Sequence, residues 1–290
     1  MKYSKLFKKG KSIENKFLNL LLEQLCSQEL NYVKKINFEC EGSYHMRIKE
    51  IDATTKATST NLLEGFGITI HDANKMSEIV IREEILQAFE ISCFVEGDKL
   101  RVCEECCLPL KLVLHEIGHA LDFHEREKYI YSIDDPTMFR FQDLITSYIN
   151  IFVSEYFAEK YAVKKILKLN PNYKLEEYQS EFSEIENLIN EHKNTYFSNR
   201  DLRKLANTLI VIGYQRILYP FSLRLGAESA LLETCENNSE FWLTNFKIVN
   251  AIETAESSLP FLFFEYFQSE MQKFGFLIQT TEKGDILKFK

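Results

Sequence analysis

Apolar residues recur with a helical period in some segments of this chain and alternate with polar residues in others. The first helical pattern runs from Ser12 to about Asn31, with apolar side chains recurring on one side. Two pairs of β-branched segments follow, and each pair flanks a short polar turn: Gly65–His71 with Met76–Arg82, and Glu90–Val95 with Lys99–Cys103. We therefore predict an N-terminal helix followed by two β-hairpins.

Helical periodicity dominates the chain after His124. Asp134-Asp135-Pro136 is a strong start signal, because Asp is a good N-cap and proline suits the first helical position. The helix that starts there is expected to end at Asn170-Pro171. Further predicted elements are helices at 174–195 and 201–218, one or two helices within 245–274, and a closing hairpin at 276–289 around Lys283-Gly284.

The segment KLVLHEIGHALDF, residues 111–123, combines an apolar stripe with polar residues on the opposite face. Pro109 is expected in the first turn of this helix, where a missing N–H costs little. Five residues recur at i, i+3, i+4, i+7 and i+11 and predict a buried face: Leu110, Val113, Leu114, Ile117 and Leu121.

His115, Glu116 and His119 lie on the other side of that helix. The two histidines are four residues apart, so their imidazoles project from one face and can reach a single ion. Glu116 lies beside them, where a carboxylate can take a proton from a water whose pKa zinc has lowered to about 7. Chance alone produces H-E-x-x-H in about one such sequence per hundred, and a metal-free descendant of a metal protein is a second alternative.

A catalytic zinc usually has three protein ligands, so a third must lie further along the chain. No glycine occurs between Gly118 and Gly213, which excludes the H-x-x-G-x-x-H continuation of other zinc peptidases. Glu155 and Glu159 share one helix face with two alanines, which permit a close helix–helix approach. We predict Glu155 as the third ligand and Glu159 as the acceptor for a ligating histidine. A solvated acidic face is the alternative.

These motifs resemble those of a known family. HEIGHAL with the later Glu155-x-x-Ala158 is similar to the gluzincin metallopeptidases, in which two helices supply His, His and Glu to one zinc ion. The segment from Glu155 to Ala162 also resembles the E-x-x-A-x-x-F-A pattern of ImmA/IrrE-like peptidases. The resemblance covers residues 111–163. It implies that His115, His119 and Glu155 bind one zinc ion per chain and that Glu116 is the general base.

Composition limits the partners and the cellular location that we expect for this protein. The net charge of −8 and a pI near 5.5 argue against nucleic-acid binding. No apolar run has the length of a transmembrane helix, and the lysine-rich opening is not followed by a signal-peptide core. We therefore expect a cytoplasmic protein that binds no membrane and acts on a protein or peptide.

Seven cysteines, an odd number, favour reduced thiols. Cys103, Cys106 and Cys107 lie in VCEECC and form a C-x-x-C pair with one extra sulfur. A structural zinc site there would need a fourth ligand such as Cys93 or Cys40. Buried thiols, a structural metal and redox regulation remain open as interpretations.

The predicted fold is α+β and zincin-like. Residues 1–130 would form a lobe with a small β-sheet and the H-E-x-x-H helix, and residues 131–290 would form a mostly helical lobe that carries Glu155. An intracellular zinc metalloendopeptidase is the leading hypothesis for the function. Its alternatives are a zinc-binding interaction module without proteolytic activity and a zinc hydrolase of a small non-peptide substrate. A peptidase also needs a donor to the oxyanion, for which the candidates are Tyr156, His192 and Tyr214.

Overall fold

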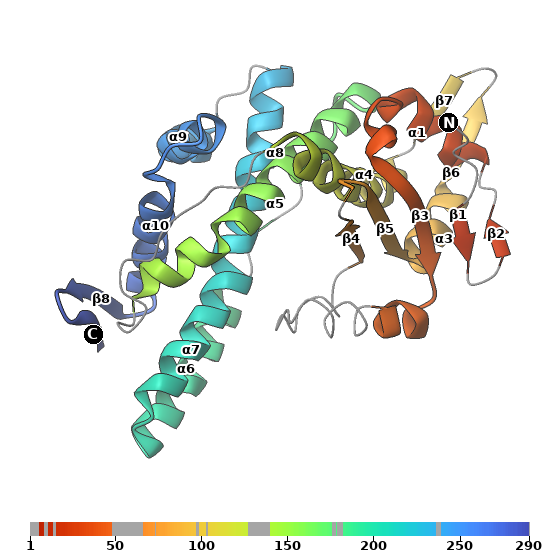
Figure 1. Cartoon of the computed structure of the whole chain (residues 1–290). Coiled ribbons are helices and arrows are strands. Elements are labelled where there is room, and N and C mark those ends of the chain that lie inside the picture. The colour runs from red at the N-terminus through yellow and green to blue at the C-terminus, as the bar shows by residue number, and fades with distance from the viewer. Residues whose placement is uncertain are drawn as a thin grey trace. The chain divides into compact units, whose positions relative to one another are not determined.

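The computed structural model combines many helices with small sheets, which confirms the predicted α+β class (Figure 1). The zincin-like architecture stays a prediction. The structure describes residues 6–8, 11–13, 16–47, 66–72, 74–96, 99–102, 104–126, 140–175, 178, 182–235 and 239–289. The chain divides into two compact units: one comprises 1–127, 157–175 and 233–235, and the other 128–156, 176–232 and 236–290.

A five-stranded sheet organises the first unit. Its strands follow the order β2-β1-β3-β5-β4, as Figure 1 shows. β3 is parallel to β1 and β5, whereas β4 is antiparallel to β5 and lies at the edge. The strands are β1 (Leu6–Lys8), β2 (Lys11–Ile13), β3 (Val33–Glu39), β4 (Gly67–His71) and β5 (Ser77–Arg82).

The first predicted hairpin is confirmed as β4 and β5. Asp72 closes its turn, because one carboxylate oxygen accepts hydrogen bonds from the N–H groups of Asn74 and Met76. The second hairpin is confirmed as β6 (Cys93–Glu96) and β7 (Lys99–Val102). The predicted strand start at Glu90 is wrong, because helix α3 (Glu83–Ser92) continues to Ser92. Glu83 and Glu84 in its first turn suit the positive end of the helix dipole.

The N-terminal helix is shorter than its pattern predicts. α1 spans Lys16–Cys26, a 3₁₀ turn η1 spans Glu29–Tyr32, and Lys11–Ile13 belongs to β2. The hydrophobic pattern does not assign β3, whose buried side chains belong to the same hydrophobic core as those of α1. Residues 41–47 are also helical.

α4 (Glu104–Glu125) carries the H-E-x-x-H motif and packs against β4 and β5. Four residues of its predicted stripe, Leu110, Val113, Leu114 and Ile117, are at most 1% exposed, and Leu121 is half-buried. The position predicted for Pro109 is wrong. Helix α4 begins five residues earlier, so this proline lies in the second turn and removes one backbone hydrogen bond.

α5 (Phe141–Leu169) is one unbroken helix that ends directly before Asn170-Pro171, where the sequence predicts its end. The predicted start at Asp134-Asp135-Pro136 lies outside the described residues. Buried residues of its second half, Ala162 and Ile166, join the core formed by α1, α4 and the sheet. Gly118 faces Ala158, since a Cβ added at Gly118 would lie 2.8 Å from the Ala158 Cα. The two backbones therefore meet where α4 carries its histidines.

The second unit is helical and ends in a hairpin. The helix predicted to start at Asp201 is present as α7, and the Asp201 side chain caps it by accepting from the Lys204 N–H. The predicted helix end at Leu218 is wrong, because a π-helical turn η3 (Gly213–Leu218) leads through Pro220 into α8. The closing hairpin is confirmed. The elements are α6 (Phe182–Asn199), α7 (Leu202–Ile212), α8 (Tyr219–Cys235), α9 (Glu240–Glu253), α10 (Leu259–Lys273), β8 (Phe276–Thr281) and β9 (Gly284–Phe289).

Helices α6 and α7 run side by side (Figure 1). The start of α6 differs from the predicted Lys174, and α9 begins at Glu240, where the Ser239 side chain accepts from the Trp242 N–H. Within the described part of the chain, no helix has the length and apolar character that crossing a membrane requires.

We predict that Gly118→Ala destabilises the fold by about 1–3 kcal/mol, because the added methyl group overpacks a backbone contact. Thermal or denaturant unfolding measures the change. Gly42→Ala is the matched control, since a Cβ there meets no atom within 4 Å. Equal stability of the two variants would show that α4 and α5 do not approach this closely.

Candidate metal centre

The structure brings together the three predicted ligands, His115, His119 and Glu155. One ligand atom from each lies within 4.8 Å of the other two. The histidine rings stand nearly perpendicular, with centroids 4.7 Å apart. His115 and Glu155 are each 8% exposed, so two of the donors are largely withdrawn from water. Among the described residues, no other group of three or more such side chains is gathered in this way.

This donor set fits a divalent transition metal. Two imidazoles and one carboxylate match the ligands that catalytic zinc prefers, and they leave a fourth position for water. Ligands about 2.1 Å from a tetrahedral zinc are separated by about 3.4 Å, so small side-chain rotations would bring these three onto one ion. The structure therefore supports a metal site at the predicted residues, and its assignment to zinc is part of the proposal below.

Glu159 lies one turn after Glu155 on α5 and contacts α4 through its carboxylate. One oxygen is 2.8 Å from His115 Nδ1 and the other is 2.9 Å from Lys111 Nζ. With Nδ1 protonated and donating to Glu159, His115 Nε2 is the nitrogen left to bind a metal. Glu159 thus stands where it can fix the tautomer and the ring orientation of His115.

The charge state of Glu159 follows from its neighbours. Burial alone raises the pKa of this carboxyl, but the hydrogen bond from His115 and the charge of Lys111 outweigh burial and lower the pKa to about 2. Glu159 is 2% exposed and Lys111 is 4% exposed. The Glu159 carboxylate, which accepts the hydrogen bond from His115, is therefore ionised at neutral pH.

Lys111 is a further residue of the site, which the motifs did not indicate. Its position four residues before His115 places both side chains on one face of α4, so the spacing was a usable signal. Lysine is usually exposed, however, and only the approach of Glu159 from another helix buries its charge.

Glu116 contacts the edge strand β4 through its carboxylate. Its Oε2 is 2.6 Å from Thr69 Oγ1, and its backbone carbonyl is 2.9 Å from the same hydroxyl. Glu116 is 8% exposed. The candidate base is therefore held at the border between α4 and the sheet.

Tyr214 is the oxyanion-donor candidate that the structure places near a predicted ligand. Burial, with further contributions from Glu155 and Tyr148, raises the pKa of Tyr214 to about 12. It lies on the π-helical turn, where the Tyr219 N–H donates to the Tyr214 carbonyl. The other tyrosine, Tyr156, donates a hydrogen bond from its hydroxyl to Glu253 Oε1, and the two oxygens are 2.5 Å apart. His192 lies on α6 and lines a groove with α7 residues.

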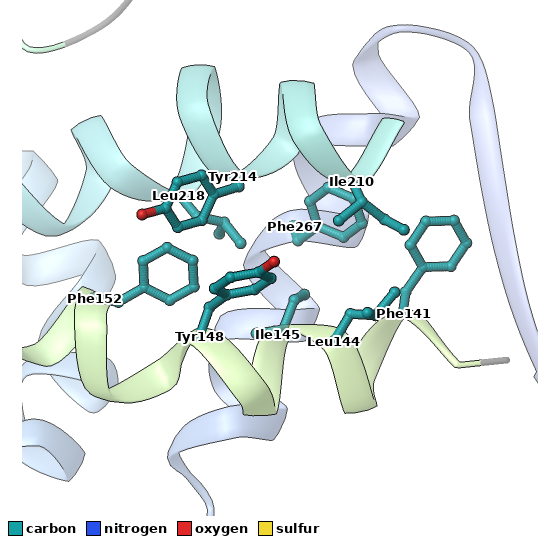
Figure 2. Close-up of a pocket in the computed structure, with 9 residues that line it drawn as sticks. All are labelled: Phe141, Leu144, Ile145, Tyr148, Phe152, Ile210, Tyr214, Leu218 and Phe267. Carbon is teal, nitrogen blue, oxygen red and sulfur yellow. The ribbon is translucent and has the colours of Figure 1, made fainter. Parts of the chain in front are cut away.

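Tyr214 lines a small hollow together with other aromatic and aliphatic side chains. Figure 2 shows the Tyr214 hydroxyl turned toward the Phe152 end of α5, whereas the Tyr148 hydroxyl points the other way. Phe152 precedes Glu155 by three residues on α5. The hollow is lined by Phe141, Leu144, Ile145, Tyr148, Phe152, Ile210, Tyr214, Leu218 and Phe267.

The cysteine segment contributes no described metal site. Cys107 is 1% exposed, and its sulfur lies 3.7 Å from the Asn170 side-chain amide, which favours the interpretation as a buried thiol. Cys103 lies outside the described residues, as does the side chain of Cys106. Cys40 is exposed and lies 3.4 Å from the Ser43 hydroxyl.

No family model, curated protein or solved structure matches this chain. The resemblance to the gluzincins therefore stays a prediction from the motifs, and the function proposed below is argued from the geometry of the site.

We predict that Glu155→Ala lowers zinc affinity much more than Glu159→Ala. The first change removes a ligand, whereas the second removes an acceptor that orients His115, which typically costs about ten- to a hundredfold. Competition with a chromophoric chelator measures both affinities, with wild type expected to hold one zinc ion per chain. Wild-type affinity in Glu155→Ala would assign the third ligand elsewhere.

Proposed function

We propose that this protein is a zinc-dependent metallopeptidase that hydrolyses peptide bonds of a protein substrate inside the cell. The observation that carries the proposal is the gathering of His115, His119 and Glu155, with Glu116 next to the first ligand in the chain. Two imidazoles and a carboxylate leave a coordination position open, as hydrolytic zinc sites require. A purely structural zinc site would instead be closed by a fourth protein ligand.

Side chains of this protein can carry out the proton transfer and the ligand orientation that peptide hydrolysis needs. A zinc ion held there would polarise a water and lower its pKa to about 7. Glu116 accepts the proton of that water and later returns it to the leaving amine. Glu159 keeps His115 oriented through its Nδ1, and Lys111 holds the second oxygen of Glu159. The reaction therefore needs no further acid or base.

Tyr214 supports the same chemistry as a donor to the developing oxyanion. A tyrosine hydroxyl is protonated at neutral pH and can donate a hydrogen bond, and this hydroxyl lies within the electrostatic influence of Glu155. A preorganised donor in a site that excludes water stabilises negative charge far more than the same group does in bulk water.

The edge strand β4 suits an extended peptide. It pairs with β5 on one side, and no described strand occupies its other side. An extended chain can add to such an edge through backbone hydrogen bonds, which bind peptides with little regard to sequence. Because Thr69 of β4 contacts Glu116, a peptide added there would lie close to the base.

We expect Glu116→Gln to keep the fold and the zinc while lowering turnover by about 10² to 10⁴, because an amide cannot accept the proton. The variant also serves to trap substrates, and cleavage of each retained protein is compared at matched zinc content. Equal cleavage by both proteins would contradict the mechanism. If wild type cleaves no retained partner, the interpretation as a non-proteolytic zinc module replaces the peptidase.

Tyr214→Phe should lower kcat by about 10²-fold with little change in KM or zinc affinity, the usual effect of losing one oxyanion donor. Tyr148→Phe is the matched control, since it removes a hydroxyl from the same hollow that points away from the Phe152 end of α5. Steady-state kinetics on a trapped substrate measure both variants. An equal kcat for the Tyr214 variant and wild type would remove Tyr214 from the mechanism.

A further inference from the structure

Two residues of β4 hold the carboxylate of Glu116. Gly67 and Thr69 are two positions apart in an extended strand, so they face the same side of the sheet. The Thr69 hydroxyl contacts the Glu116 carboxylate. Gly67 has no side chain, and the Glu116 carboxylate lies next to the position that a Cβ would take there. The α4 residue that we assign as the base is therefore seated on the edge strand.

The contact with Thr69 has the length of a charge-assisted hydrogen bond. An O–H···O⁻ bond measures about 2.5–2.7 Å, and Thr69 Oγ1 lies 2.6 Å from Glu116 Oε2. The hydroxyl has one hydrogen, and the ionised carboxylate is a stronger acceptor than the backbone carbonyl at 2.9 Å. Oε2 is thereby engaged, which makes Oε1 the oxygen that could accept a proton.

Gly67 sets the position of Oε1. A Cβ built at Gly67 would lie 2.8 Å from Oε1, 2.9 Å from Cγ and 3.0 Å from Cδ of Glu116. The backbone at Gly67 does not require a glycine, because its φ is outside the left-handed region. What requires a glycine is the Glu116 carboxylate, which lies where a side chain would begin. An alanine there would displace the end of a flexible side chain and leave the backbones where they are.

We propose that Thr69 is a positioning residue for the general base and that Gly67 provides the room that this position requires. The inference rests on the proposed function, since it assigns Glu116 as the base. Thr69 holds one oxygen and Gly67 admits the carboxylate against the strand. The orientation of the base is thus built into β4, the strand at which an extended substrate would pair. A displacement of about 1 Å at a reacting group can cost a hundredfold in rate.

Acetohydroxamate is a probe that does not depend on knowing the substrate. It binds zinc through two oxygens, and the proton that it loses needs an acceptor such as the Glu116 carboxylate. The experiment measures its affinity for zinc-loaded wild type, Glu116→Gln, Thr69→Val, Thr69→Ser and Gly67→Ala by calorimetry. Matched controls are Thr280→Val, at an exposed strand threonine, and Gly42→Ala, where a Cβ meets nothing within 4 Å.

We expect Thr69→Val and Gly67→Ala to weaken acetohydroxamate binding about tenfold, the scale of one hydrogen bond to a charged group. Thr69→Ser keeps the hydroxyl and should restore most of the affinity, which a loss of packing alone would not allow. Both controls should match wild type. With a trapped substrate, Thr69→Val should lower kcat while KM and zinc affinity stay unchanged.

Two outcomes would overturn the inference in distinguishable ways. If Glu116→Gln weakens binding but Thr69→Val and Gly67→Ala match wild type, then β4 does not position the base, and the proposed function is untouched. If Glu116→Gln itself binds like wild type, Glu116 does not act on a ligand of the metal. In that case the inference and the proposed mechanism both fail.

Discussion

The close approach of α4 to α5 at Gly118 and Ala158 is the constraint on which the metal centre depends. His115 and His119 flank Gly118 on α4, and Glu155 and Glu159 flank Ala158 on α5. Side chains of five or six heavy atoms can meet at one ion, or in one hydrogen bond, only if the two helices lie close together. The one glycine of α4 and one of the two alanines of α5 therefore stand beside the functional residues. The apolar stripe of α4 holds the other side of that helix against the sheet.

Burying this much charge needs compensation. Glu116, Glu155 and Glu159 are each at most 8% exposed, and an uncompensated buried carboxylate costs several kcal/mol. Lys111 neutralises Glu159, Thr69 donates to Glu116, and a divalent cation would offset Glu155. A metal that binds only the folded chain also stabilises it, so the site and the stability of its surroundings are linked.

The sequence was sufficient where periodicity and spacing decide the outcome. The stripe from Leu110 to Ile117 is buried as predicted, and Glu155 with Glu159 lies one turn apart on a helix that faces α4. It was insufficient where the structure depends on contacts between residues that are far apart in the sequence. β3 is fixed by pairing with β1 and β5, and Pro220 follows a π-helical turn instead of ending the helix. The roles of Lys111, Gly67 and Thr69 likewise appear only when Glu159 and Glu116 meet them across the fold.

X-ray absorption at the zinc edge of the loaded protein tests the central claim most directly, because it reports the donor atoms themselves. A site made by His115, His119 and Glu155 predicts only nitrogen and oxygen neighbours at about 2.0–2.1 Å, with the outer-shell scattering of two imidazoles. Sulfur neighbours at about 2.3 Å would place the metal at the cysteines instead and would contradict the assignment of the centre to α4 and α5.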